Sequence, residues 1–166
     1  MAKKKEEKTN VMRILDQKKV VYTMRTYEEG DGPMGTSEYG LHIAQLLGQD
    51  PAQVFKTLVA RGASKAIYVY EIPVAENLDL KKAAKAVGEK SIELLHVSEI
   101  NAVTGYVRGG CTPIGMKKQF PTVFHATVEN QETVCISGGK IGIQIELPVK
   151  DLLEITRGQV AEIIVD

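Results

Sequence analysis

Two apolar, β-favouring segments, residues 55–60 and 66–70, lie on either side of a short turn at residues 62–65. Pro51 precedes the first segment and Gly62 follows it, as expected for the ends of a strand. Two such runs joined by a few turn residues are typical of a β-hairpin. The sequence therefore predicts a pair of neighbouring, mostly buried strands near the middle of the chain.

Lys56 lies inside the first of these strands, next to Thr57. Removing a lysine from water costs free energy unless the ammonium finds a partner or its pKa falls. Two interpretations follow from the residues alone. Lys56 is either an edge-strand lysine that discourages pairing with another chain, or the floor of a binding site.

Short helices and strands alternate along the rest of the chain, with few βαβ units. Five helices are expected. The first runs from a cap at Thr9 or Asn10 through Leu15, and the second from a cap at Thr36 or Ser37 to Gly48. The others are residues 80–87 between Asp79 and Gly88, a short helix that opens with residues 98–101, and a helix from Pro148 through Ile155. The further strands are expected at 20–27, 92–97, 122–125, 133–136 and 141–147, with a loop over 28–35. This order predicts an α+β (mixed α/β), largely antiparallel single domain.

The formal net charge is zero, with 21 basic and 21 acidic residues. A nucleic-acid partner would therefore meet a local basic patch and not the field of the whole molecule. No apolar run reaches the length needed to span a bilayer, so no membrane association is expected. Residues 1–8 are expected to be a charged N-terminal tail and 9–166 the folded domain. Cys111 and Cys135 form no CxxC, which favours reduced thiols and a cytoplasmic protein.

Seven of the fifteen glycines fall between Gly105 and Gly142. They are concentrated in two segments, residues 108–115 and 137–140, each with a basic residue. Glycine allows a backbone to approach a ligand closely, and exposed N–H groups bind anions. These segments are either tight turns or a cradle for a phosphate or a ribose. The expected phosphate contacts are Arg108, Lys117, Lys118, Lys140, Lys81 and Lys85.

Several kinds of active site are disfavoured. The P-loop spacing and the dinucleotide-binding fingerprint are absent. His42, His96 and His125 have no metal-ligand spacing, so neither a metal nor another cofactor is expected. Cys111 and Ser137 have no histidine in a recognisable motif beside them, which disfavours an enzyme nucleophile. A site in this chain would consist of a lysine, backbone amides and hydroxyls, without an obvious base.

Four separated motifs resemble those of the YbaK/EbsC family of trans-editing aminoacyl-tRNA deacylases, which is related to the editing domain of prolyl-tRNA synthetase. The motifs are residues 54–58 (VFKTL), 78–84 (LDLKKAA), 104–115 (TGYVRGGCTPIG) and 137–140 (SGGK). The resemblance runs from about residue 10 to the C-terminus and is greatest to the cysteinyl-tRNA(Pro) deacylase branch. It implies a mixed α/β, barrel-like sheet with surrounding helices.

The resemblance also implies a set of site residues. The family lysine required for activity matches Lys56, and the catalytic set adds Gly110 and Ser137. The expected substrate-binding residues are Tyr27, Tyr39, Thr57, Gly109, Gly138, Gly139 and Gln144. Gln144 departs from the family pattern, which has an acidic residue there. Because an amide cannot act as a base, an acid–base role at this position is not expected.

In this branch the cysteine thiol of the substrate attacks its own ester, which releases the tRNA and leaves a cyclic thiolactone. The enzyme then supplies positioning, and backbone amides near Gly110 or Ser137 stabilise the oxyanion. Lys56 holds the terminal adenosine or its phosphate, or favours the thiolate. The expected partners are the acceptor end of aminoacyl-tRNA(Pro) and prolyl-tRNA synthetase. The alternatives are a hydrolytic alanyl-tRNA(Pro) deacylase and a tRNA 3′-end or nucleotide-binding module without turnover.

Overall fold

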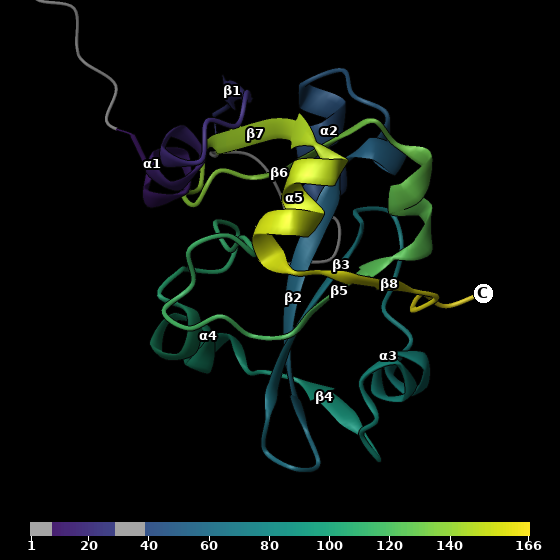
Figure 1. Cartoon of the computed structure of the whole chain (residues 1–166). Helices are drawn as coiled ribbons and strands as arrows, with labels where there is room; N and C mark the ends of the chain where they lie inside the picture. Colours follow the sequence, from purple (N-terminus) through teal and green to yellow (C-terminus); the bar gives the residue numbers. More distant parts are fainter. Residues whose placement is uncertain (1–7, 29–38) are drawn as a thin grey trace, which may run out of the picture.

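Two β-sheets form the body of the molecule in the part of the chain that the computed structural model describes, residues 8–28 and 39–166 (Figure 1). The five-stranded sheet has the order β4-β2-β3-β5-β8. Its strands are β2 (Phe55–Gly62), β3 (Ile67–Pro73), β4 (Ile92–Leu94), β5 (Thr122–His125) and β8 (Gln159–Ala161). The three-stranded sheet has the order β1-β7-β6, with β1 (Thr23–Thr26), β6 (Thr133–Ser137) and β7 (Ile143–Pro148).

The predicted hairpin is confirmed. β2 and β3 pair antiparallel from Phe55 opposite Pro73 to Arg61 opposite Ile67. On its other side β2 pairs with β4, but only over Ala60 to Gly62. Lys56 therefore belongs to an inner strand of the sheet, at a position beyond the end of β4. This place in the fold favours a site lysine over an edge-strand lysine.

Four of the six strand pairs in the described residues are antiparallel, and the pairs β3–β5 and β5–β8 are parallel. An isolated bridge between Val54 and Cys135 joins the two sheets just before β2 begins. The expectation of a mixed, largely antiparallel α+β domain is thus confirmed. Nothing in the sequence had indicated β8, which adds a second parallel pair at the far edge.

In the described residues, five α-helices surround the sheets: α1 (Asn10–Gln17), α2 (Tyr39–Leu46), α3 (Leu80–Val87), α4 (Val97–Thr104) and α5 (Val149–Thr156). Two 3-10 helices, η1 (Pro51–Gln53) and η2 (Ala126–Asn130), complete the elements. The predicted caps at Thr9 and Asp79 accept backbone hydrogen bonds. The predicted loop over 28–35, apart from Glu28, lies outside the described residues, and so do the predicted caps Thr36 and Ser37. Of the predicted N-terminal tail only Lys8 is described, and it forms an ion pair with Asp16.

Three strands are shorter than predicted. β4 ends at Leu94 and not at residue 97, because Val97 already belongs to α4. β1 starts at Thr23, and residues 20–22, which were predicted to belong to the strand, form a loop before it. β7 starts at Ile143, because Gly142 adopts a φ of 94° and the chain turns there. The N–H of Ile143 donates to the Lys140 carbonyl across this turn. Alternation of apolar residues alone did not reveal the turn.

The core lies on both faces of the hairpin. Phe55 and Phe124 belong to a cluster with α1, α5 and the three-stranded sheet, whereas Tyr70 and Ile72 pack with α3 on the opposite face. Tyr70 also donates a hydrogen bond to the Ala83 carbonyl at 2.9 Å, which anchors α3. The first half of β2, with Lys56, lies beside the bridge that joins the two sheets. No helix in the described residues is long and apolar enough to cross a membrane.

Candidate active site

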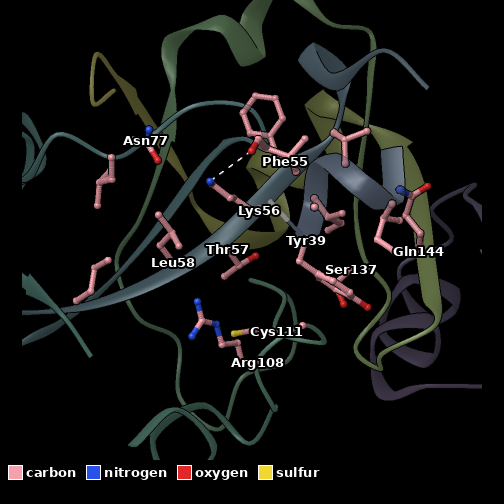
Figure 2. A pocket seen from close by; sticks show the side chains of 18 of the residues that line it. Tyr39, Phe55, Lys56, Thr57, Leu58, Asn77, Arg108, Cys111, Ser137 and Gln144 are labelled. Carbon is pink, nitrogen blue, oxygen red and sulfur yellow. Dashed lines mark hydrogen bonds between the residues drawn. The ribbon is translucent and has the colours of Figure 1, made fainter. Parts of the chain in front are cut away.

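A cavity of about 390 Å³ lies beside the first half of β2, within the size range of small-molecule sites. β2 supplies its floor, α2 and the residues after β3 supply walls, and β6, β7 and the loop after α4 complete it. Figure 2 shows Lys56 and Thr57 on β2, with Arg108 and Cys111 on one side and Ser137 and Gln144 on the sheet beyond Tyr39. The cavity thus collects residues from several stretches that lie far apart in the sequence.

The Lys56 side chain is partly buried at this floor. Its Nζ donates to the backbone carbonyl of Val74 at 3.4 Å, and no carboxylate in the described residues forms an ion pair with it. Burial disfavours the ammonium and lowers the Lys56 pKa from its usual value of 10.5, an effect that the charge of Glu76 partly offsets. A cation without a charged partner is available to stabilise negative charge on a bound substrate.

The two glycine-rich segments pack directly against each other. A Cβ on Gly110 would lie 3.1 Å from the backbone nitrogen of Ile141 and 3.2 Å from the Lys140 backbone. A side chain here would push the two segments apart by a few tenths of an ångström, so glycine suits the place where they meet. Its N–H donates to the Val107 carbonyl at 2.9 Å. That N–H is therefore occupied in a turn.

Gly109 and Cys111 are the neighbours of Gly110 that line the cavity. Gly109 has a φ of 89°, which lies in the left-handed region. Within the described residues, neither of these two backbone N–H groups donates a hydrogen bond. A free backbone N–H that faces a cavity can bind an anion, so these two amides are better placed than that of Gly110 to stabilise an oxyanion.

The segment from Ser137 to Lys140 contributes less of the cavity than predicted. Ser137 lines it, but its Oγ accepts the N–H of Gly139 at 3.2 Å. Gly138 is buried, and its N–H donates to the Ile143 carbonyl. Gly139 lies against Val11 and Tyr106, away from the cavity. Tyr27, Tyr39, Thr57 and Gln144, the other expected substrate-binding residues, line the cavity.

Gln144 is fixed by a reciprocal pair of amide hydrogen bonds with Gln49, which follows α2. Gln144 accepts from Gln49 Nε2 at 2.7 Å and donates to Gln49 Oε1 at 2.9 Å. It is only 3% exposed. The amide that replaces the expected acid therefore holds the α2 end against the three-stranded sheet, and it offers no base to the cavity. The sequence did not indicate Gln49.

Glu71 is a further residue that the sequence analysis missed. It lies in β3 opposite Thr57 in the register and is fully buried, and neither carboxylate oxygen has a hydrogen-bond partner in the described residues. Burial raises its pKa well above 4.5, and Thr57 opposes this only in part. The sequence did contain a signal for this residue, because Glu71 is an acid between Tyr70 and Ile72 in an otherwise apolar strand. Burial thus favours the protonated, neutral form of the Glu71 side chain.

The two thiols are poor nucleophiles. Burial raises the pKa of Cys111, which lines the cavity, to about 12. Burial also raises the pKa of Cys135 to about 12. Cys135 accepts weak hydrogen bonds from Gln49 and Arg25 in the polar network behind the cavity. No group of three or more potential metal ligands occurs in the described residues.

We expect the Cys111→Ser variant to keep its single-turnover deacylation rate within about threefold of the wild type, because a thiol with a pKa near 12 is almost fully protonated at neutral pH. The same variant should react equally in the presence of a metal chelator. A loss of the chemical step by two orders of magnitude, with substrate still bound, would make Cys111 a nucleophile. Cys135→Ser serves as the matched control.

The fold and the site define an aminoacyl-tRNA editing domain, and comparison with known proteins agrees. The model of the aminoacyl-tRNA editing domain family matches residues 41–155, so the chain belongs to this family. The family membership confirms the prediction of an aminoacyl-tRNA deacylase. Tyr27 and Tyr39 lie outside the matched range, although they line the cavity.

A relative from Enterococcus faecalis is named "Putative Cys-tRNA(Pro)/Cys-tRNA(Cys) deacylase EbsC" and is 44% identical over 164 residues, covering 98% of each chain. A solved structure described as a "putative trans-editing enzyme for prolyl tRNA synthetase" superposes with a TM-score of 0.77 at 22% identity, over 97% of this chain and 100% of that one. The hypothetical protein APE2540 superposes with a TM-score of 0.81 at 21% identity, over 93% and 99%. These two structures share the fold.

Proposed function

We propose that the protein removes cysteine from mischarged tRNA(Pro), with the thiol of the substrate attacking its own ester. The observation that carries this proposal is a cavity with a cation and backbone amides but no activated nucleophile or base among its described residues. Cys111 is protonated, the Ser137 hydroxyl is engaged with Gly139, and Gln144 is fixed by Gln49. The nucleophile must then come from the substrate or from water.

The shape of the cavity supports binding of the terminal aminoacyl-adenosine. Its lining includes four leucines, Leu58, Leu78, Leu80 and Leu94, together with the amide of Asn77. Apolar walls with one convergent polar group suit the face and edge of an adenine. Figure 2 shows Tyr39 and Ser137 on the other side of Lys56 from Asn77, and we place the cysteinyl group there. Lys56 lies on the floor between them, where the ester would be placed.

The reaction itself needs little from the protein beyond geometry. The thiolate attacks the ester carbonyl, a C–S bond forms, the C–O bond to the ribose breaks, and the ribose oxygen takes up a proton. Correct orientation of an intramolecular nucleophile can supply about 7–11 kcal/mol of the barrier. We infer that Lys56 favours the thiolate and that the amides of Gly109 and Cys111 stabilise the oxyanion.

The choice of nucleophile is tested by single-turnover rates on tRNA(Pro) carrying cysteine, serine or alanine, since saturating enzyme isolates the chemical step. A pocket that senses one small group discriminates by about 10–200-fold. Cysteine keeps a few per cent thiolate at neutral pH, whereas a serine hydroxyl has almost no anion and alanine has no nucleophile. We expect cysteine to react more than about 200-fold faster than either. Equal rates would replace this proposal with a water-activating deacylase.

Selectivity for tRNA(Pro) over other tRNAs is the remaining part of the proposal. The solved structure described as a trans-editing enzyme for prolyl tRNA synthetase supports a role beside that synthetase. We propose that prolyl-tRNA synthetase presents the mischarged tRNA to this domain. Addition of catalytically inactive prolyl-tRNA synthetase should then raise the ratio of deacylation on cysteinyl-tRNA(Pro) to that on cysteinyl-tRNA(Cys). An unchanged ratio would remove the synthetase from the proposal.

A further inference from the structure

A second hollow, of about 810 Å³, lies outside the cavity and shares no lining residue with it. The C-terminal ends of α1 and α5 form two of its walls, and the loop over 113–119 forms the third; these elements can be located in Figure 1. We refer to this hollow as the basic groove. Its basic residues are Lys18, Lys19, Lys117, Lys118 and Arg157.

The charges of the basic groove are concentrated and unneutralised. All five basic side chains are exposed, and within the described residues none forms an ion pair. Asp151 and Glu154 also line the groove, which leaves five positive against two negative charges. The chain as a whole has a net charge of zero, so this excess is local. A local positive groove attracts a polyanion.

Backbone conformation strengthens the case that these side chains are used. Lys19 has a φ of 58° and Arg157 a φ of 54°, and both lie just after a helix. Glycine is the residue that such positions favour. A cation at a helix C-terminus also gains from the helix dipole, but that effect is confined to the last turn and does not account for Lys117 and Lys118 on the loop.

One loop links the basic groove to the cavity. Its residues Arg108, Gly109 and Cys111 line the cavity, and residues 113–119 line the groove. The loop is held in place: Gln119 donates to the Thr156 carbonyl at 2.9 Å, and Tyr106 donates to the Ile114 carbonyl at 2.6 Å. Lys117 is six positions after Cys111, so the Cα atoms of these two residues are at most about 22 Å apart. The unpaired 3′ end of a tRNA spans a similar distance.

We propose that the basic groove binds the phosphodiester backbone of tRNA where the acceptor stem leads into the 3′ end, while the aminoacyl ester occupies the cavity. This inference rests on the proposed function for the identity of the ligand. The phosphates bind to Lys18, Lys117, Lys118 and their neighbours. Because the same loop lines the cavity, phosphates bound in the groove fix the position of the 3′ end relative to the cavity. The groove contributes affinity, and the cavity carries out the reaction.

The test uses the Lys18→Glu/Lys118→Glu double variant. Its matched control is Lys65→Glu/Lys90→Glu, which changes the net charge equally at exposed sites outside both hollows. We expect the groove variant to bind uncharged tRNA(Pro) at least about tenfold more weakly. The slope of log affinity against log salt should fall by about 1.4, because each lost phosphate contact contributes about 0.7. The control should bind as the wild type does.

Two further measurements separate this inference from the proposed function. Cysteinyl-adenosine, which has no phosphate, should be cleaved equally by the groove variant and the wild type. If the wild type cleaves no ester, the proposed function fails, while weaker tRNA binding by the groove variant still supports the groove. Equal tRNA binding by the groove variant and the wild type would overturn the inference. Loss of synthetase binding with tRNA binding unchanged would assign the groove to a protein partner and overturn it too.

Discussion

Lys56→Met should lower the single-turnover rate of cysteinyl-tRNA(Pro) deacylation by at least about 10²–10³-fold, the loss typical of removing one group that stabilises an oxyanion. Methionine keeps the apolar stem of the lysine but removes the cation from the cavity floor. Because Lys56 has no ion-pair partner in the described residues, its removal leaves no carboxylate unpaired. The melting temperature should therefore stay the same or rise. Lys90→Met, at an exposed position, is the control.

The pH dependence gives a second measure of the same residue. The rate should rise with pH as the substrate thiol, with an ordinary pKa of about 8.5, becomes a thiolate. It should fall again as Lys56 loses its proton, and the lowered pKa of Lys56 places this descending limb below the usual lysine value of 10.5. In Lys56→Met the descending limb should disappear. A near-normal rate with the limb retained would show that Lys56 takes no part in the reaction.

Glu71→Gln should stabilise the protein at pH 8. Burial raises the pKa of Glu71 in the folded state above its value in the unfolded chain, so the folded state binds the extra proton. The wild type therefore loses free energy of unfolding as the pH rises above about 4.5, towards the raised pKa. Because glutamine is neutral at every pH, the free energy of unfolding of the variant does not fall with pH through this position. Each pH unit between the pKa of the unfolded chain and the raised pKa of the folded state costs the wild type about 1.4 kcal/mol, which sets the scale of the expected gain at pH 8.

Thermal melts at pH 5 and pH 8 measure this effect. A gain of 1 kcal/mol corresponds to about 2–4 °C for a chain of this size. Because other groups also titrate, the relevant quantity is the difference between variant and wild type, which should be larger at pH 8 than at pH 5. Glu93→Gln, at an exposed position in β4, should show no such difference. The same gain at both pH values would mean that Glu71 is not the titrating group.

Local signals predicted much of the fold because they act between near neighbours in the chain. Asp79 accepts the N–H groups of Lys81 and Lys82, and Gly88 has a φ of 73°, so the ends of α3 were set by these residues themselves. The hairpin turn and the apolar runs of β2 and β3 likewise predicted their own pairing. β8 was not predicted because three residues have no periodicity of their own, and the strand exists only through its parallel pairing with β5.

The sequence by itself determined the motif residues, and so it predicted Lys56, Thr57 and the glycine-rich segments as parts of one site. Tertiary structure decided which atoms of these residues are available. The N–H of Gly110 is used by Val107, and the amide of Gln144 is used by Gln49, 95 positions away. It also buried Glu71 and brought Lys18 and Arg157 beside Lys117. Hydrogen bonds, burial and charge density depend on distances in space, and spacing along the chain does not specify those distances.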